Sequence, residues 1–261
     1  MYSAFHELLA DRKGGAIFTC FGVWHLLYLL LIGGAIAGVV ILLRRKGEHT
    51  RERTIRGTIA LAFGLYVADF FLMPFAYGEI DVEKLPFHVC TAMCVMSFWS
   101  RHWAPLSKYT GTFARLGLIS NLIYVIYPAG VGWYAIHPLS YRVWQPLLFH
   151  GIMTAYGLLV LIYESSSRPQ KRRRWWQEAL ICVLMVLWAL LGNTLYNGTW
   201  EDTTRLYIWS FGVRDPFYLL PANVAPFVMP FVMLLLLVGL DLLMCTLCFG
   251  AARLPLHKKK Q

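Results

Sequence analysis

Apolar residues gather in seven long stretches along this chain, and short polar segments separate them. A run of about 20 apolar residues is long enough to cross the hydrocarbon core of a bilayer as a helix. The pattern therefore predicts an all-α polytopic membrane protein, with one integral membrane domain over residues 1–261. The seven spans are expected near residues 16–43, 57–77, 85–100, 111–128, 146–163, 176–195 and 217–250.

The composition supports this fold class and the charges orient it. Hydrophobic residues make up 58% of the chain and charged residues 15%, which is too apolar for an ordinary soluble domain. Alternate connections carry 18 of the 24 basic residues, an arrangement that the positive-inside rule predicts for cytoplasmic loops. The N-terminus is then expected outside and the C-terminus in the cytoplasm. Because the net charge of +10 resides in these loops, no nucleic-acid partner is expected. The basic residues in question are Arg44, Arg45, Lys46, Arg51, Arg53, Arg56, Arg101, Lys108, Arg115, Arg168, Lys171, Arg172, Arg173, Arg174, Arg253, Lys258, Lys259 and Lys260.

Polar residues inside the predicted spans share one depth. At 1.5 Å per helical residue, all of them fall in the outer half of the bilayer, and six of the seven spans contribute. Any one of them is explained by a hydrogen bond between helices, whereas their common depth predicts a polar cavity open to the outer side. Ionisable groups in hydrocarbon are costly and commonly mark functional sites. The set consists of His25, Asp69, His88, Cys90, His150, Asn193 and Asn223.

The stretch "LPFHVC" (residues 85–90) places a histidine and a cysteine at the mouth of the third span. Pro86 suits the first turn of a helix, and a cysteine near a helix N-terminus is favoured as a thiolate. Backbone N–H groups of the same turn suit an oxyanion. His88 and Cys90 are two residues apart and point to different sides if both are helical. His150, from another span at a similar depth, is therefore the better base for a Cys90 nucleophile.

These residues resemble the Leu-Pro-x-His-x-Cys motif of the bacterial YwaF-type integral membrane proteins, relatives of the animal transmembrane protein 164. Further pieces follow in the same order, namely "FGVWHLLYLL", "PLLFHGIM", "LLGNTLYN" and "RDPFYLLP". For the animal relatives the resemblance implies a cysteine-dependent membrane acyltransferase that moves fatty acyl chains between phospholipids. It places the nucleophile at Cys90 and its partner at His150. The segment after Asn193 matches only loosely, which leaves substrate selection open.

Together, the residues and the resemblance predict a phospholipid acyltransferase, transacylase or lipase that uses Cys90 as nucleophile, His150 as base and His88 as a further catalytic group. His25, Asp69, Asn193 and Asn223 are expected to support the site or bind substrate. Membrane phospholipids and lysophospholipids are the expected partners, and no cofactor is expected because the sequence shows no nucleotide or coenzyme A motif. The site is expected on the extracytoplasmic half of the membrane, which in a bacterium is the cell membrane.

Two alternatives from other classes stay open at the level of sequence. A zinc-dependent lipid hydrolase would use His25, His88, His150 and Asp69 as ligands. A proton-coupled transporter would use Asp69 and the histidines as a relay. The transporter needs a polar path through the inner half of the bundle, where Asp241 alone stands out in the sequence.

Overall fold

A computed structural model describes residues 15–77, 85–128, 131, 135–164, 175–198, 220–221 and 223–253. Every regular element within these ranges is a helix, which confirms the predicted all-α class. The elements are α2 (Val23–Arg44), α3 (Glu48–Tyr77), α4 (Val89–Ser100), α5 (Ala104–Ser107), α6 (Thr110–Ile126), α8 (Tyr141–Leu159), the π-helical turn η2 (Val160–Glu164), α9 (Trp175–Asn197) and α11 (Ala225–Arg253).

Seven of these helices correspond to the seven predicted spans. Five are long and apolar enough to cross a membrane, and α4 and α6 are shorter apolar helices. The chain is thus a multi-pass membrane protein. Five helix starts differ from the prediction by four residues or more: α2 begins at Val23 rather than near 16, α3 at Glu48 rather than 57, α4 at Val89 rather than 85, α8 at Tyr141 rather than 146, and α11 at Ala225 rather than 217.

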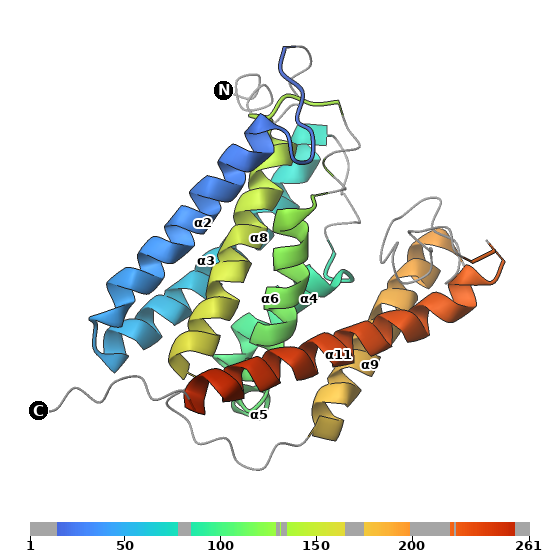
Figure 1. The fold of residues 1–261 in the computed structure, drawn as a ribbon. Coiled ribbons are helices and arrows are strands. Elements are labelled where there is room, and N and C mark those ends of the chain that lie inside the picture. Colours follow the sequence, from blue (N-terminus) through green and yellow to red (C-terminus); the bar gives the residue numbers. More distant parts are fainter. Residues whose placement is uncertain are drawn as a thin grey trace, which may run out of the picture.

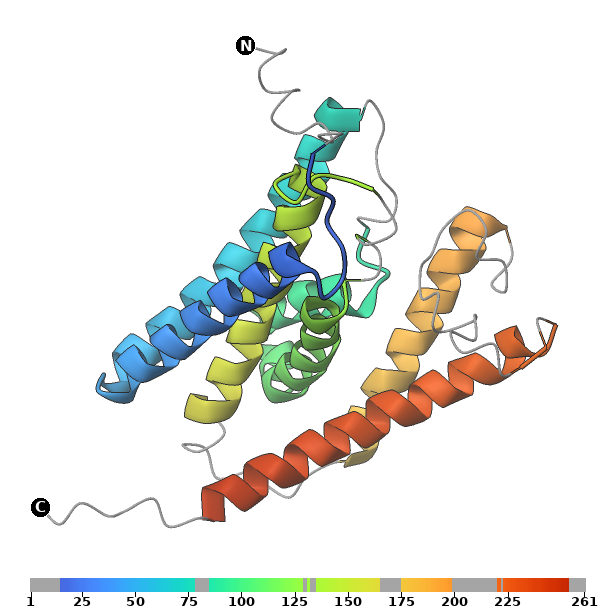
Figure 2. The same ribbon diagram turned by 45° about the horizontal axis from the view of Figure 1, so that its top comes forward.

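In Figure 1, α2, α3 and α8 run side by side, and α6 and α4 lie to the right of α8. Helices α9 and α11 cross each other further to the right, and their upper ends diverge from the other helices in Figure 1 and Figure 2. Lower down, α9 and α11 pack on α4 and α6 through one core cluster that includes Met93, Leu116, Met185 and Leu237. Helix α11 also passes the lower end of α6, with which it is in contact.

The tightest packing joins α6 to α8. A Cβ atom built on Gly157 of α8 would lie 2.6 Å from Cβ of Leu118 and 2.8 Å from the carbonyl oxygen of Ala114, so no larger residue fits there without movement. Small residues allow helix backbones to approach closely in membrane proteins. This contact fixes the relative position of the two helices that carry the groups around His150.

The interior where α6, α9 and α11 meet is more polar than the sequence indicates. Arg115 was counted with the cytoplasmic connections, but it lies inside α6 and is buried. Its Nε donates to Oδ1 of Asp241 at 2.6 Å and its Nη2 to Oε1 of Glu178 at 2.8 Å. The three charges join α6 to α9 and α11. A buried charge needs a partner to offset its desolvation, and here the partners come from helices far apart in sequence.

Candidate active site

Cys90 lies in the first turn of α4. The helix is capped by His88, which has extended backbone angles, so Cys90 is the second helical residue. The N–H groups of a first turn make no bonds inside their own helix, and the positive end of the helix dipole favours a thiolate. His88 lies outside the helix, and its carbonyl oxygen accepts hydrogen bonds from the Ala92 N–H at 2.9 Å and from the Thr91 hydroxyl at 3.0 Å.

Helix α4 begins four residues later than the sequence predicts, at Val89. Its 12 residues extend about 18 Å at 1.5 Å per residue, which is shorter than a hydrocarbon core of about 30 Å. Residues 85–88 precede the helix as turns and bends.

Helix α9 supports this irregular segment. The indole Nε1 of Trp188 donates to the Pro86 carbonyl oxygen at 2.7 Å, and the Phe87 ring stacks on the Trp188 ring with centroids 4.8 Å apart. Gly192 gives Phe87 its space, because a Cβ atom there would lie 2.6 Å from Cγ of Phe87. The position of Cys90 thus depends on α9 as well as on α4.

His150 lies in the middle of α8 and is buried. The predicted span made it an interfacial residue, but α8 begins nine residues before it. The ring of Tyr124 stacks on the imidazole with centroids 3.8 Å apart, and Phe149 meets it edge-on at 5.1 Å. These contacts fix the plane of the imidazole ring.

Asn121 of α6 orients the His150 imidazole. Its Oδ1 lies 2.6 Å from Nδ1 of His150, and its amide nitrogen donates to the Gly117 carbonyl oxygen at 2.7 Å. Because the amide nitrogen is turned to Gly117, the amide oxygen faces the ring, and Nδ1–H is the donor. The neutral imidazole then has its accepting lone pair on Nε2. This is the tautomer that a general base requires.

The helices that carry Cys90 and His150 pack against the same aromatic side chains. The ring centroid of Tyr66 in α3 lies 6.3 Å from that of Phe149, the neighbour of His150. Cys94, one turn after Cys90, packs in the core cluster that contains Phe149. Helices α3, α4 and α8 therefore meet at the level of the two proposed reactive side chains.

His25 has a structural position rather than a catalytic one. It lies in the first turn of α2, not nine residues into a span as predicted, and it is completely buried. Its Nδ1 accepts from the Phe21 N–H at 2.9 Å, and its Nε2 lies 3.0 Å from the Val125 carbonyl oxygen. Both ring nitrogens are engaged by backbone, so neither offers a lone pair to zinc.

The remaining predicted residues differ in burial. Asp69 is buried and accepts a hydrogen bond from the Tyr141 hydroxyl at 2.7 Å. Asn193 is buried in α9 directly after Gly192, which packs on Phe87. Asn223 is exposed and precedes the start of α11. Asp69 and Asn193 thus lie in the helices that border "LPFHVC", whereas Asn223 lies outside these helices.

Sequence reasoning missed Asn121. The signal was present, because an asparagine in the middle of the apolar stretch 111–128 is as unusual as a histidine there. Unlike Asn193 and Asn223, it lies in the one predicted span that contributes no residue to the candidate set. Its role emerges only from the contact with a helix that lies 29 residues further along the chain.

Among known proteins, the TMEM164 family model matches residues 20–249. This match covers "LPFHVC", His150 and most of the chain. The chain belongs to the TMEM164 family. This confirms the resemblance drawn from the sequence motifs. No curated protein and no solved structure matches this member of the TMEM164 family.

Proposed function

We propose that this protein is a cysteine-dependent acyltransferase that moves an acyl chain from one glycerophospholipid to a lysophospholipid without coenzyme A. The observation that carries the proposal is the Asn121–His150 hydrogen bond, which turns the basic Nε2 of a buried histidine away from its anchor. A nucleophilic thiol needs a base oriented by a third group. In this chain Cys90 would be the nucleophile, His150 the base and Asn121 the group that orients the base.

The first half of the reaction forms a thioester. His150 Nε2 takes the proton of the Cys90 thiol, and the sulfur attacks the carbonyl carbon of the phospholipid ester. The bond between that carbon and the glycerol oxygen breaks, and the imidazolium returns the proton to the leaving oxygen. The first turn of α4 supplies N–H groups on the side where negative charge develops on the carbonyl oxygen.

The second half transfers the chain. The hydroxyl of a lysophospholipid gives its proton to His150 Nε2 and attacks the thioester carbonyl. The carbon–sulfur bond then breaks, and the proton passes to the departing thiolate. Water in place of the lysophospholipid would make the same site a lipase, so the acceptor decides between transfer and hydrolysis.

The zinc alternative is the weaker one because of His25. Both of its ring nitrogens are used by backbone groups. One of the three histidines proposed as ligands thus has no nitrogen lone pair left for a metal ion.

Detection of the acyl-enzyme tests the proposal. Purified protein incubated with radiolabelled phospholipid is expected to carry an acyl group at Cys90 that hydroxylamine releases. Cys90→Ala is expected to abolish labelling, and Cys94→Ala, one turn further on in the core cluster, serves as the matched control. Lipid turnover that survives Cys90→Ala and is lost with a chelator would replace the thiol mechanism by a zinc hydrolase.

A further inference from the structure

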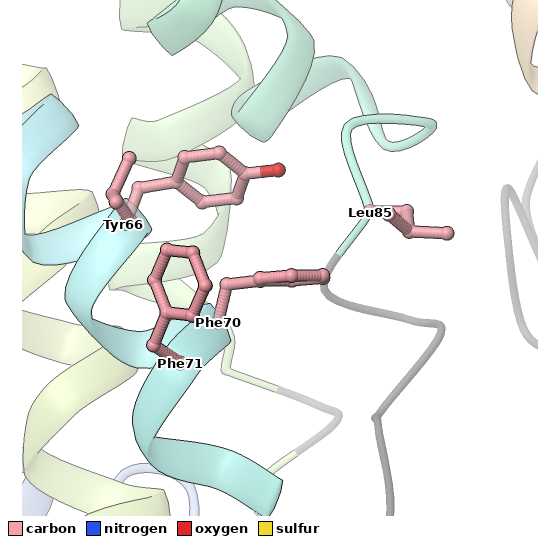
Figure 3. Close-up of a pocket in the computed structure, with 5 residues that line it drawn as sticks. Tyr66, Phe70, Phe71 and Leu85 are labelled. Carbon is pink, nitrogen blue, oxygen red and sulfur yellow. The ribbon is translucent and has the colours of Figure 1, made fainter.

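A partly open cavity of about 210 Å³ lies between α3 and the segment that precedes α4. The residues that line it are Tyr66, Val67, Phe70, Phe71 and Leu85. In Figure 3 the rings of Tyr66 and Phe70 both extend from α3 toward Leu85 across the open space.

The chemistry of the lining is almost uniform. Val67, Phe70, Phe71 and Leu85 are wholly apolar, and the Tyr66 hydroxyl is the single polar side-chain group among the five. The four α3 residues follow an i, i+1, i+4, i+5 spacing, which forms one face of a helix. A phosphate or a sugar would find neither a charge nor a set of hydrogen bonds here, whereas an alkyl chain would find continuous contact.

One end of the cavity adjoins the elements of the candidate site. The ring centroid of Tyr66 lies 6.3 Å from that of Phe149, the neighbour of His150, and Leu85 belongs to the same "LPFHVC" stretch as Cys90. A chain that lies along Phe70 and Val67 would therefore have its ester at the Tyr66 end, toward the elements that carry Cys90 and His150.

We propose that this groove binds the acyl chain of the donor phospholipid, with the methylene groups nearest the ester between α3 and Leu85. The inference rests on the proposed function. A chain that leaves the bilayer for an apolar groove gains little hydrophobic free energy, because both surroundings are apolar. The groove therefore acts through orientation, which raises the rate of attack when the reacting atoms are aligned.

Filling the groove tests this role. Val67→Trp is expected to reduce acylation of Cys90 by long-chain phospholipids at least tenfold, while a small soluble acetyl ester still acylates Cys90 at the wild-type rate. Leu61→Trp is the matched control, since Leu61 lies on α3, is 55% exposed and does not line the groove. Phe70→Ala, which enlarges the groove, is expected to relax chain selectivity and provides a second variant if Val67→Trp does not fold.

A binding measurement separates this proposal from the proposed function. A phosphatidylcholine with a photoactivatable diazirine near the ester is expected to crosslink to residues 66–71 and 85, in both wild-type and Cys90→Ala protein, and unlabelled lipid is expected to compete. Crosslinks at the groove without acylation of Cys90 would refute the catalytic proposal and leave the binding site standing. Labelling that Val67→Trp leaves unchanged, spread along all lipid-facing helices, would show ordinary boundary lipid and overturn the groove.

Discussion

At the scale of single residues, three of the ionisable groups first assigned to the site have different hydrogen-bond partners. His25 bonds to two backbone groups, His150 to an amide side chain, and Asp69 to a tyrosine hydroxyl. The contact of His150 with Asn121 is the one of these that leaves the other ring nitrogen, Nε2, as an acceptor, as a general base requires. A buried polar residue is therefore not catalytic by burial alone, and its hydrogen-bond partners decide what it does.

Substitution of Asn121 tests its role as a positioning residue. Asn121→Ala is expected to slow acylation of Cys90 about 10- to 100-fold, since loss of a buried hydrogen-bond partner costs about 1–3 kcal/mol. Asn121→Asp is expected to recover most of the rate, because a carboxylate also accepts from Nδ1–H. It would also stabilise the imidazolium, so the acid limb of the pH–rate profile moves to higher pH. An unchanged profile together with an unchanged rate would remove Asn121 from the machinery.

Substitution of His25 is expected to lower stability rather than the rate of acylation. His25→Ala leaves the Phe21 N–H and the Val125 carbonyl without their partner, and each buried group left unsatisfied costs about 1–3 kcal/mol. We expect a lower midpoint of thermal unfolding in detergent, with the acylation rate per folded molecule close to that of wild type. A protein of wild-type stability with a strongly reduced rate would instead make His25 a catalytic group.

At the scale of elements, the site depends on how closely α6 approaches α8. Asn121 and Tyr124 come from α6 and His150 from α8, and the two helices meet at Gly157 with contacts below 3.0 Å for any added Cβ. The Arg115 ion pairs tie α9 and α11 to the same α6. Helix α9 also contacts the segment before Cys90, through Trp188 and Pro86. Helix α6 is therefore linked to His150 directly and to the Cys90 segment through α9.

Gly157→Ala tests this packing. The added methyl group has no room against Leu118 and Ala114, and overpacking of a close contact typically costs about 1–3 kcal/mol. We expect a lower unfolding midpoint and a reduced acylation rate, because α6 and α8 must separate. Gly64→Ala is the matched control: nothing lies within 4 Å of its Cβ position, and alanine has the higher helix propensity. Equal effects of both substitutions would show that the contact does not govern the site.

At the scale of the whole molecule, the start of α2 and the end of α11 lie at opposite ends in Figure 1. The seven predicted crossings would place these two ends on opposite sides of a membrane. The charge distribution of the connections predicts the direction, because basic loops stay in the cytoplasm. With that direction, the first turn of α4 is expected to face the outer half.

Labelling of two engineered cysteines tests the direction. Ser166 and Thr203 both lie outside the described residues, so the prediction for them comes from the sequence. In a background without reactive native thiols, Thr203→Cys is expected to react with an impermeant maleimide from outside, and Ser166→Cys only after the membrane is opened. Labelling of both from one side would contradict the topology.

The sequence by itself determined the fold class, the number of apolar helices and the family, because length and apolarity are local properties and "LPFHVC" is contiguous. The tertiary structure decided where α4 begins, that Arg115 is a buried ion-pair partner rather than a loop cation, and that Asn121 orients His150. Each of these depends on a contact between helices distant in the chain. Hydrophobic patterning shows which residues are buried, but the partner of a buried polar group is set by which helices pack together and at what height.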